Sequence, residues 1–132
     1  MSSSINKEDK KNLRIALVAG EKSGDKLGGD LILSLKKIFP NAKFLGVGGE
    51  EMIAAGMESF FDIEKISVMG ILEPLLNIFE LLSLRRSLKE FLVQQKPDIF
   101  IGIDAPEFNL PISKFLKQRI GIKTVQYVSP SI

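Results

Sequence analysis

The sequence of 132 residues contains no cysteine and no histidine. Without cysteine it can form no disulfide and no zinc-thiolate site, and it has no thiol nucleophile. Without histidine it lacks the commonest general base and the commonest metal ligand. Any acid–base catalysis within this chain must therefore fall to Asp, Glu, Lys or Tyr.

An excess of charge of one sign is also absent, since 18 basic and 16 acidic residues give a formal net charge of +2. This balance argues against a nucleic-acid-binding protein with a broad phosphate-binding face. The hydrophobic content of 45% and charged content of 26% are close to those of an ordinary globular protein. The length suits one domain with its own core.

Long apolar runs are missing as well. No segment is long enough to cross a bilayer, and residues 1–12 are polar and lack the apolar stretch of a secretory signal. We expect residues 1–12 to be a flexible tail, residues 13–132 to form the folded domain, and the protein to be cytoplasmic.

The sequence does contain an alternation of strand and helix patterns. Strands are predicted at 14–19, 44–47, around 59–61, at 99–103 and at 124–128. Helices are predicted around 27–38, 50–55 and from Pro74 to about Gln95, followed by a last helix with Asn109 as N-cap and Pro111 near its first position. This order predicts an α/β fold, a doubly wound parallel sheet.

Ligands bind such sheets at the C-terminal ends of the strands, where loops 20–25, 46–50 and 104–109 and the chain end at Ser129 are expected. Loop 20–25 could present backbone N–H groups to an anion, although the favoured interpretation is that Ser23 or Asp25 caps the following helix.

Residues 46–49 depart from a dinucleotide fingerprint because Glu51 stands at the position of its third glycine, so a tight turn is favoured there.

Asp104 follows the clearest buried strand and is the strongest candidate for a general base. Pro106 should keep Ala105 out of the α region, so that the loop stays extended and the carboxylate faces the crevice. An aspartate that only accepts hydrogen bonds from its own loop is an equally open interpretation. Asp98 has a weaker claim because it precedes the same strand, at the opposite edge of the sheet.

The segment from Ile71 to Leu84 is unusually apolar. One helical stripe holds Leu75, Ile78, Phe79 and Leu82, and further leucines lie off this stripe. Arg85, Arg86 and Lys89 follow. Such a helix is expected either to be buried, between layers or against a second domain, or to bind at a membrane surface.

Four segments in this order resemble the lipid-A-disaccharide synthase family: residues 15–25, 68–70 with Glu73, 96–109 and 127–131. The resemblance implies the N-terminal, acceptor-side Rossmann-like domain of an inverting GT-B glycosyltransferase of Gram-negative bacteria. Its substrates would be UDP-2,3-diacylglucosamine and lipid X, and its products lipid A disaccharide 1-phosphate and UDP. It implies peripheral association with the inner membrane and no metal or other cofactor. The C-terminal donor domain would be missing, so we expect this chain to be a fragment that is inactive alone.

Carried over residue by residue, the resemblance makes Asp104 the base that takes the proton from the 6-hydroxyl of the acceptor. The residues it implies for substrate binding are Ser23, Gly24, Asp25, Met69, Gly70, Glu73, Pro106, Asn109 and Ser129. Those implied for membrane or acyl-chain contact are Leu72, Leu76, Phe79, Arg85 and Arg86. Gln126 stands where the family usually has histidine. The alternatives are a nucleotide-binding α/β module and a non-catalytic membrane-surface protein derived from such an enzyme.

Overall fold

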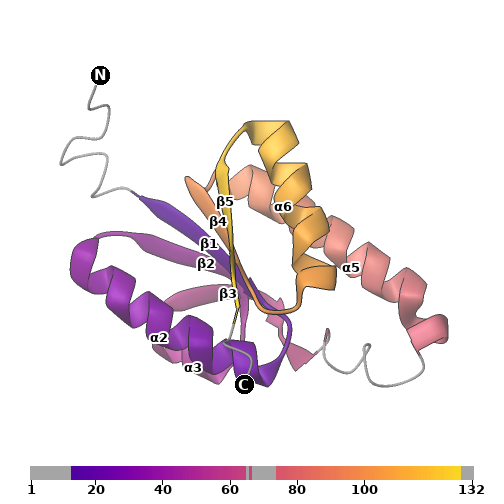
Figure 1. The fold of residues 1–132 in the computed structure, drawn as a ribbon, viewed down its shortest axis with the longest axis horizontal. Coiled ribbons are helices and arrows are strands. Elements are labelled where there is room, and N and C mark those ends of the chain that lie inside the picture. Colours follow the sequence, from indigo (N-terminus) through magenta and orange to yellow (C-terminus); the bar gives the residue numbers. More distant parts are fainter. Residues whose placement is uncertain (1–12, 65, 67–73, 129–132) are drawn as a thin grey trace.

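The structure, a computed structural model, describes residues 13–64, 66 and 74–128 (Figure 1). These residues form five parallel strands in the order β3-β2-β1-β4-β5. The strands are β1 Arg14–Ala19, β2 Lys43–Gly48, β3 Met57–Asp62, β4 Ile99–Ile103 and β5 Lys123–Tyr127. The predicted doubly wound parallel sheet is confirmed. The β3 strand, for which the sequence pattern was weakest, is paired with β2.

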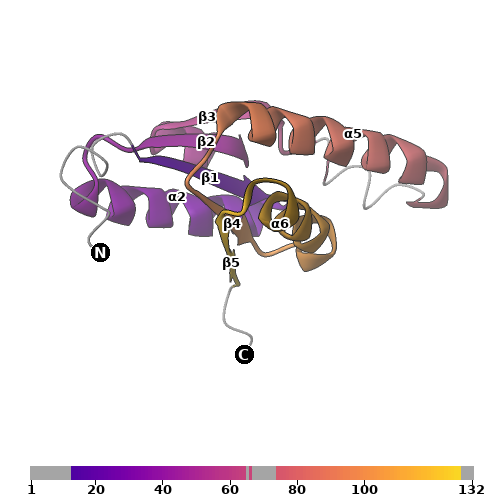
Figure 2. The same ribbon diagram turned by 90° about the horizontal axis from the view of Figure 1, so that it is seen from above.

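The helices are α2 Lys22–Ile38, α3 Glu50–Ala54, α5 Pro74–Gln95 and α6 Pro106–Ile120. Helices α2 and α3 cover one face of the sheet, and α5 and α6 cover the other (Figures 1 and 2). The central strand β1 is buried from Ile15 to Ala19, as its continuous apolar run predicts. The chain moves outward from β1 to β3 and then returns to the other side of β1 for β4, which places a switch point between β1 and β4.

Gly46 lies within β2, which runs to Gly48, so the predicted tight turn over 46–49 is wrong for residues 46–48. Its φ of 145° is rarely adopted by other residues. A Cβ atom here would lie 1.8 Å from the Leu17 carbonyl oxygen. Glycine is therefore required for β1 and β2 to pair, and the chain leaves the sheet only after Gly48.

The start of α6 also differs from the prediction. The helix begins at Pro106 with Ala105 as N-cap, so Asn109 and Pro111 lie inside it. Asp104 and Ala105 both have positive φ, 47° and 40°, and this left-handed turn directs the chain into a helix at once. Pro106 suits the first helical position because its missing N–H would have no partner there.

The apolar residues of helix α5 lie in two different environments along its length. Leu88 and Leu92, toward its C-terminal end, are fully buried in the core. Its N-terminal turns project past the edge of the sheet (Figure 1). There the exposed fractions are 42% for Ile78, 79% for Phe79 and 44% for Leu82. None of the helices within the described residues has the length and apolar character needed to cross a membrane.

Candidate functional site

Two of the predicted loops meet at the switch point between β1 and β4. A Cβ atom at Gly20, just after β1, would lie 2.9 Å from the Cβ atom of Ala105, just after β4. A Cβ atom at Gly24 would lie 3.3 Å from the Cγ2 atom of Ile103. The glycines thus let the loop after β1 pack directly against the loop that carries Asp104.

Asp104 is half-buried, and its backbone is fixed from three directions. Its N–H donates to the Tyr127 carbonyl at 2.9 Å. Its carbonyl oxygen accepts hydrogen bonds from Asn109 Nδ2 at 3.0 Å and from Gln126 Nε2 at 2.8 Å. The expected extended loop is wrong: Ala105 does avoid the right-handed α region, but it adopts the left-handed one, with φ 40° and ψ 57°.

The side chain of Asn109 points into the protein. The residue has no exposed surface, and its Nδ2 lies 3.1 Å from the Val18 carbonyl oxygen and 3.4 Å from that of Ile103. It therefore ties the ends of β1 and β4 to the Asp104 turn. Pro106, by contrast, is exposed at the start of α6.

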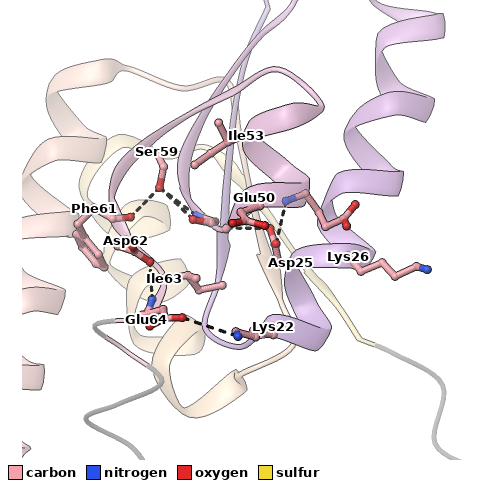
Figure 3. Close-up of a pocket in the computed structure, with 13 residues that line it drawn as sticks. Lys22, Asp25, Lys26, Glu50, Ile53, Ser59, Phe61, Asp62, Ile63 and Glu64 are labelled. Carbon is pink, nitrogen blue, oxygen red and sulfur yellow. Dashed lines mark hydrogen bonds and ion pairs between the residues drawn. The ribbon is translucent and has the colours of Figure 1, made fainter.

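Asp25 belongs to α2, but its carboxylate caps α3. It is buried and accepts backbone N–H bonds from Gly49 at 2.8 Å and from Glu51 and Met52 at 3.0 Å (Figure 3). The N-cap of α2 is Glu21, which makes no side-chain capping bond. The expectation that Ser23 or Asp25 caps α2 is therefore wrong.

Beside Asp25, a hollow of about 610 Å³ lies between α2, α3 and the end of β3 (Figure 3). Its charged lining residues are Lys22, Asp25, Lys26, Glu50, Glu51, Asp62 and Glu64. Lys22 and Glu64 form an exposed ion pair at 3.8 Å. Because carboxylates outnumber the ammonium groups, this hollow does not favour a diphosphate. Within the described part of the chain, no group of three or more Asp or Glu residues is arranged to hold a metal ion.

A second hollow, of about 790 Å³, lies along α5 and α6 and is basic. It is lined by Arg85, Arg86, Lys89 and Arg119, with Glu90 as its only carboxylate. Burial, with added repulsion from Arg85 and Arg86, lowers the pKa of Lys89 below its usual value. Arg86 is exposed, whereas Arg85 is half-buried and faces α6, where it donates to the Glu107 carbonyl at 3.2 Å.

Several predicted site residues lie outside the described residues, namely Met69, Gly70, Leu72, Glu73 and Ser129. Leu76 belongs to α5, but its side chain is not among those described.

Sequence reasoning gave Gly102 no function, although a Cβ atom there would lie 2.6 Å from Gln126 Oε1 and 2.8 Å from Asn109 Cβ. The one available signal was a glycine inside a buried strand, which often marks a close approach.

Comparison with known proteins adds to this geometry. A family model described as lipid-A-disaccharide synthetase matches residues 15–132. The chain is 56% identical over 118 residues to the lipid-A-disaccharide synthase of Alcanivorax borkumensis, covering 89% of this chain and 30% of that protein. It is 57% identical over 116 residues to the synthase of Hydrogenovibrio crunogenus, covering 88% and 31%. It is 54% identical over 119 residues to a synthase of Xanthomonas oryzae pv. oryzae, covering 90% and 27%. The chain thus spans less than a third of the length of these relatives.

Proposed function

Because this chain belongs to the lipid-A-disaccharide synthetase family, we propose that it forms the acceptor-side domain of an inverting glycosyltransferase of lipid A biosynthesis. The enzyme would transfer 2,3-diacylglucosamine from UDP-2,3-diacylglucosamine to lipid X. The products would be lipid A disaccharide 1-phosphate and UDP. The names of the relatives support the lipid A pathway, and the substrates are our proposal.

The observation that carries this proposal is the place of Asp104. It follows β4 at the switch point of the sheet, where α/β proteins bind their ligands, and the glycine loop after β1 packs against its turn. In a chain without histidine or cysteine, a carboxylate at this point is the best available general base.

The chemistry follows from that position. The Asp104 carboxylate takes the proton of the acceptor 6-hydroxyl while its oxygen attacks the anomeric carbon of the donor. The new C–O bond forms on one face as the bond to UDP breaks on the other, which inverts the anomeric centre. UDP leaves with the bonding electrons, and the proton stays on Asp104.

We assign the donor site to the part of the relatives' length that this chain does not span. The acidic hollow beside Asp25 supports this division because it does not favour the diphosphate of a nucleotide sugar. Ser23 and Pro106 are exposed on the two loops at the switch point, and we propose that both contact the acceptor. For Met69, Gly70 and Glu73 an acceptor contact, and for Ser129 a substrate contact, stays a prediction from the sequence.

We also propose that the protein associates peripherally with the cytoplasmic face of the inner membrane. Phe79 and its exposed apolar neighbours Ile78 and Leu82 lie on turns of α5 that project past the sheet. The exposed cation of Arg86 follows on the same helix. An apolar end followed by cations suits a helix that contacts lipid chains and anionic headgroups.

The test joins this chain to the C-terminal remainder of the Alcanivorax borkumensis relative. The joined protein is incubated with UDP-2,3-diacylglucosamine and lipid X, and the products are identified by mass spectrometry and by the anomeric coupling in NMR. We expect UDP and a β-linked disaccharide 1-phosphate. A folded joined protein that makes neither, beside an active complete relative, would contradict the proposal.

A further inference from the structure

Two amide side chains converge on one backbone atom beneath the proposed site. Asn109 of α6 and Gln126 of β5 both donate to the Asp104 carbonyl oxygen, at 3.0 and 2.8 Å. Both elements follow the Asp104 turn in the sequence, α6 directly and β5 after it. Gly102 leaves room for them, because a side chain there would collide with both.

The turn that they hold is strained. Asp104 and Ala105 are consecutive non-glycine residues with positive φ. Each such residue costs about 1–3 kcal/mol and persists only where its surroundings enforce it. The two amide donors, together with the bond from the Asp104 N–H to Tyr127, supply that enforcement.

The same amides are poorly explained by stability alone. Asn109 Oδ1 and Gln126 Oε1 are both buried without a hydrogen-bond partner among the described residues. Burying an acceptor in this way costs about 1–3 kcal/mol. Unsatisfied groups of this kind call for an explanation, and here both belong to side chains that donate to the same carbonyl.

We propose that Asn109 and Gln126 are positioning residues, whose amide N–H groups hold the Asp104 carbonyl so that the Asp104 carboxylate is directed at the acceptor hydroxyl. This inference rests on the proposed function of Asp104. The two residues differ in their surroundings. Asn109 also ties β1 to β4 and has no exposed surface, whereas Gln126 lies on the edge strand β5 and is partly exposed. Gln126 can therefore be changed with less risk to folding.

The decisive variant is Gln126→Met, which keeps the length of the side chain and removes its donor. In the joined two-domain protein we expect kcat to fall about 10–100-fold, the effect of a slightly misplaced catalytic group, with KM for both substrates nearly unchanged. Gln126→His restores an N–H donor and should recover most of kcat. Gln118→Met, on the exposed face of α6, is the matched control and should behave as the parent.

A double-mutant cycle separates positioning from a general structural effect. If Gln126 acts through Asp104, adding Gln126→Met to Asp104→Asn should lower kcat no further. The inference would be overturned if Gln126→Met lowered kcat by the same factor in the Asp104→Asn background as in the parent. It would also be overturned if Gln126→His did not recover the kcat that Gln126→Met loses. Parental kcat in Gln126→Met, with Asp104→Asn inactive, would overturn it while leaving the proposed function intact. Parental kcat in Asp104→Asn would instead remove the proposed base and the inference with it.

Discussion

The carboxylate of Asp25 accepts three backbone N–H bonds from the first turn of α3, although Asp25 itself lies in α2. At the scale of single residues, one buried side chain thus joins two helices. It satisfies donors that α3, a helix of five residues, could not satisfy internally. The contact fixes α3 against α2 beside the switch point.

Replacing Asp25 by alanine should therefore destabilise the fold. Because three backbone donors would lose a charged acceptor, we expect the free energy of unfolding to fall by about 2–4 kcal/mol. Urea denaturation followed by circular dichroism measures this change. Asp30→Ala, an exposed aspartate of the same helix, should change stability by less than about 0.5 kcal/mol.

An Asp25→Ala protein with unchanged stability would contradict this account. If that protein also lost transfer in the joined enzyme, Asp25 would belong to substrate binding, as the family resemblance implies.

At the scale of elements, the proline inside α6 determines a contact with α5. Pro111 has no N–H to donate to the carbonyl of Glu107, four residues earlier. Arg85 of α5 donates to that carbonyl instead, at 3.2 Å, and its guanidinium lies 5.9 Å from the centre of the Phe108 ring. The carbonyl that Pro111 leaves without a helical donor thus receives its hydrogen bond from the neighbouring helix.

Arg85→Met should lower the free energy of unfolding by about 0.5–1.5 kcal/mol, since it removes one hydrogen bond and one cation–π contact. Arg86→Met, on an exposed side chain, is the control. In a Pro111→Ala background the Glu107 carbonyl regains a helical donor, so Arg85→Met should cost less there. Equal losses in both backgrounds, measured by urea denaturation, would refute the compensation.

The proposed association with the membrane should depend on the N-terminal turns of α5. Phe79→Ser combined with Leu82→Ser removes exposed apolar surface without touching the core, so binding should weaken at little cost in stability. Co-sedimentation with vesicles containing anionic phospholipid measures the loss. Leu110→Ser, an exposed leucine on α6, should leave binding unchanged. Undiminished binding by the double variant would place the contact elsewhere.

The elements themselves were largely predictable, because continuous apolar runs mark the buried strands and glycine or proline marks most helix ends. The start of α6 was not. Asn109 with Pro111 satisfies the local pattern for a helix start as well as Pro106 does, and the choice depends on the left-handed turn at Asp104 and Ala105. That turn is held by Gln126, twenty-two positions along the chain, which no local pattern reports.

The candidate site, like the fold, was only partly predictable from the sequence. Asp104 and loop 20–25 were identified because they follow strands of a parallel sheet, whose C-terminal ends share one edge. The capping of α3 by Asp25 could not be foreseen, since its partners lie more than twenty residues away. Nor could the burial of Asn109, whose partner carbonyls include one on β1.

At the scale of the whole molecule, the strand order β3-β2-β1-β4-β5 brings the two loops of the proposed acceptor site together. The chain moves to one side of β1 and then to the other, so the loops after β1 and β4 meet at the switch point. The projecting end of α5 lies toward the same edge of the sheet (Figure 1). The proposed membrane contact and the proposed acceptor site thus lie toward one edge of the sheet.

The most direct test of this account is the rate of sugar transfer by the joined two-domain protein carrying Asp104→Asn. Asparagine tolerates the left-handed backbone at this position, so the change removes the base and little else. We predict that kcat falls about 10²–10⁴-fold. Asp98→Asn, at the opposite end of the same strand, should leave kcat near the parental value. Parental kcat in the Asp104→Asn protein would contradict the account, and so would an equal loss in both variants.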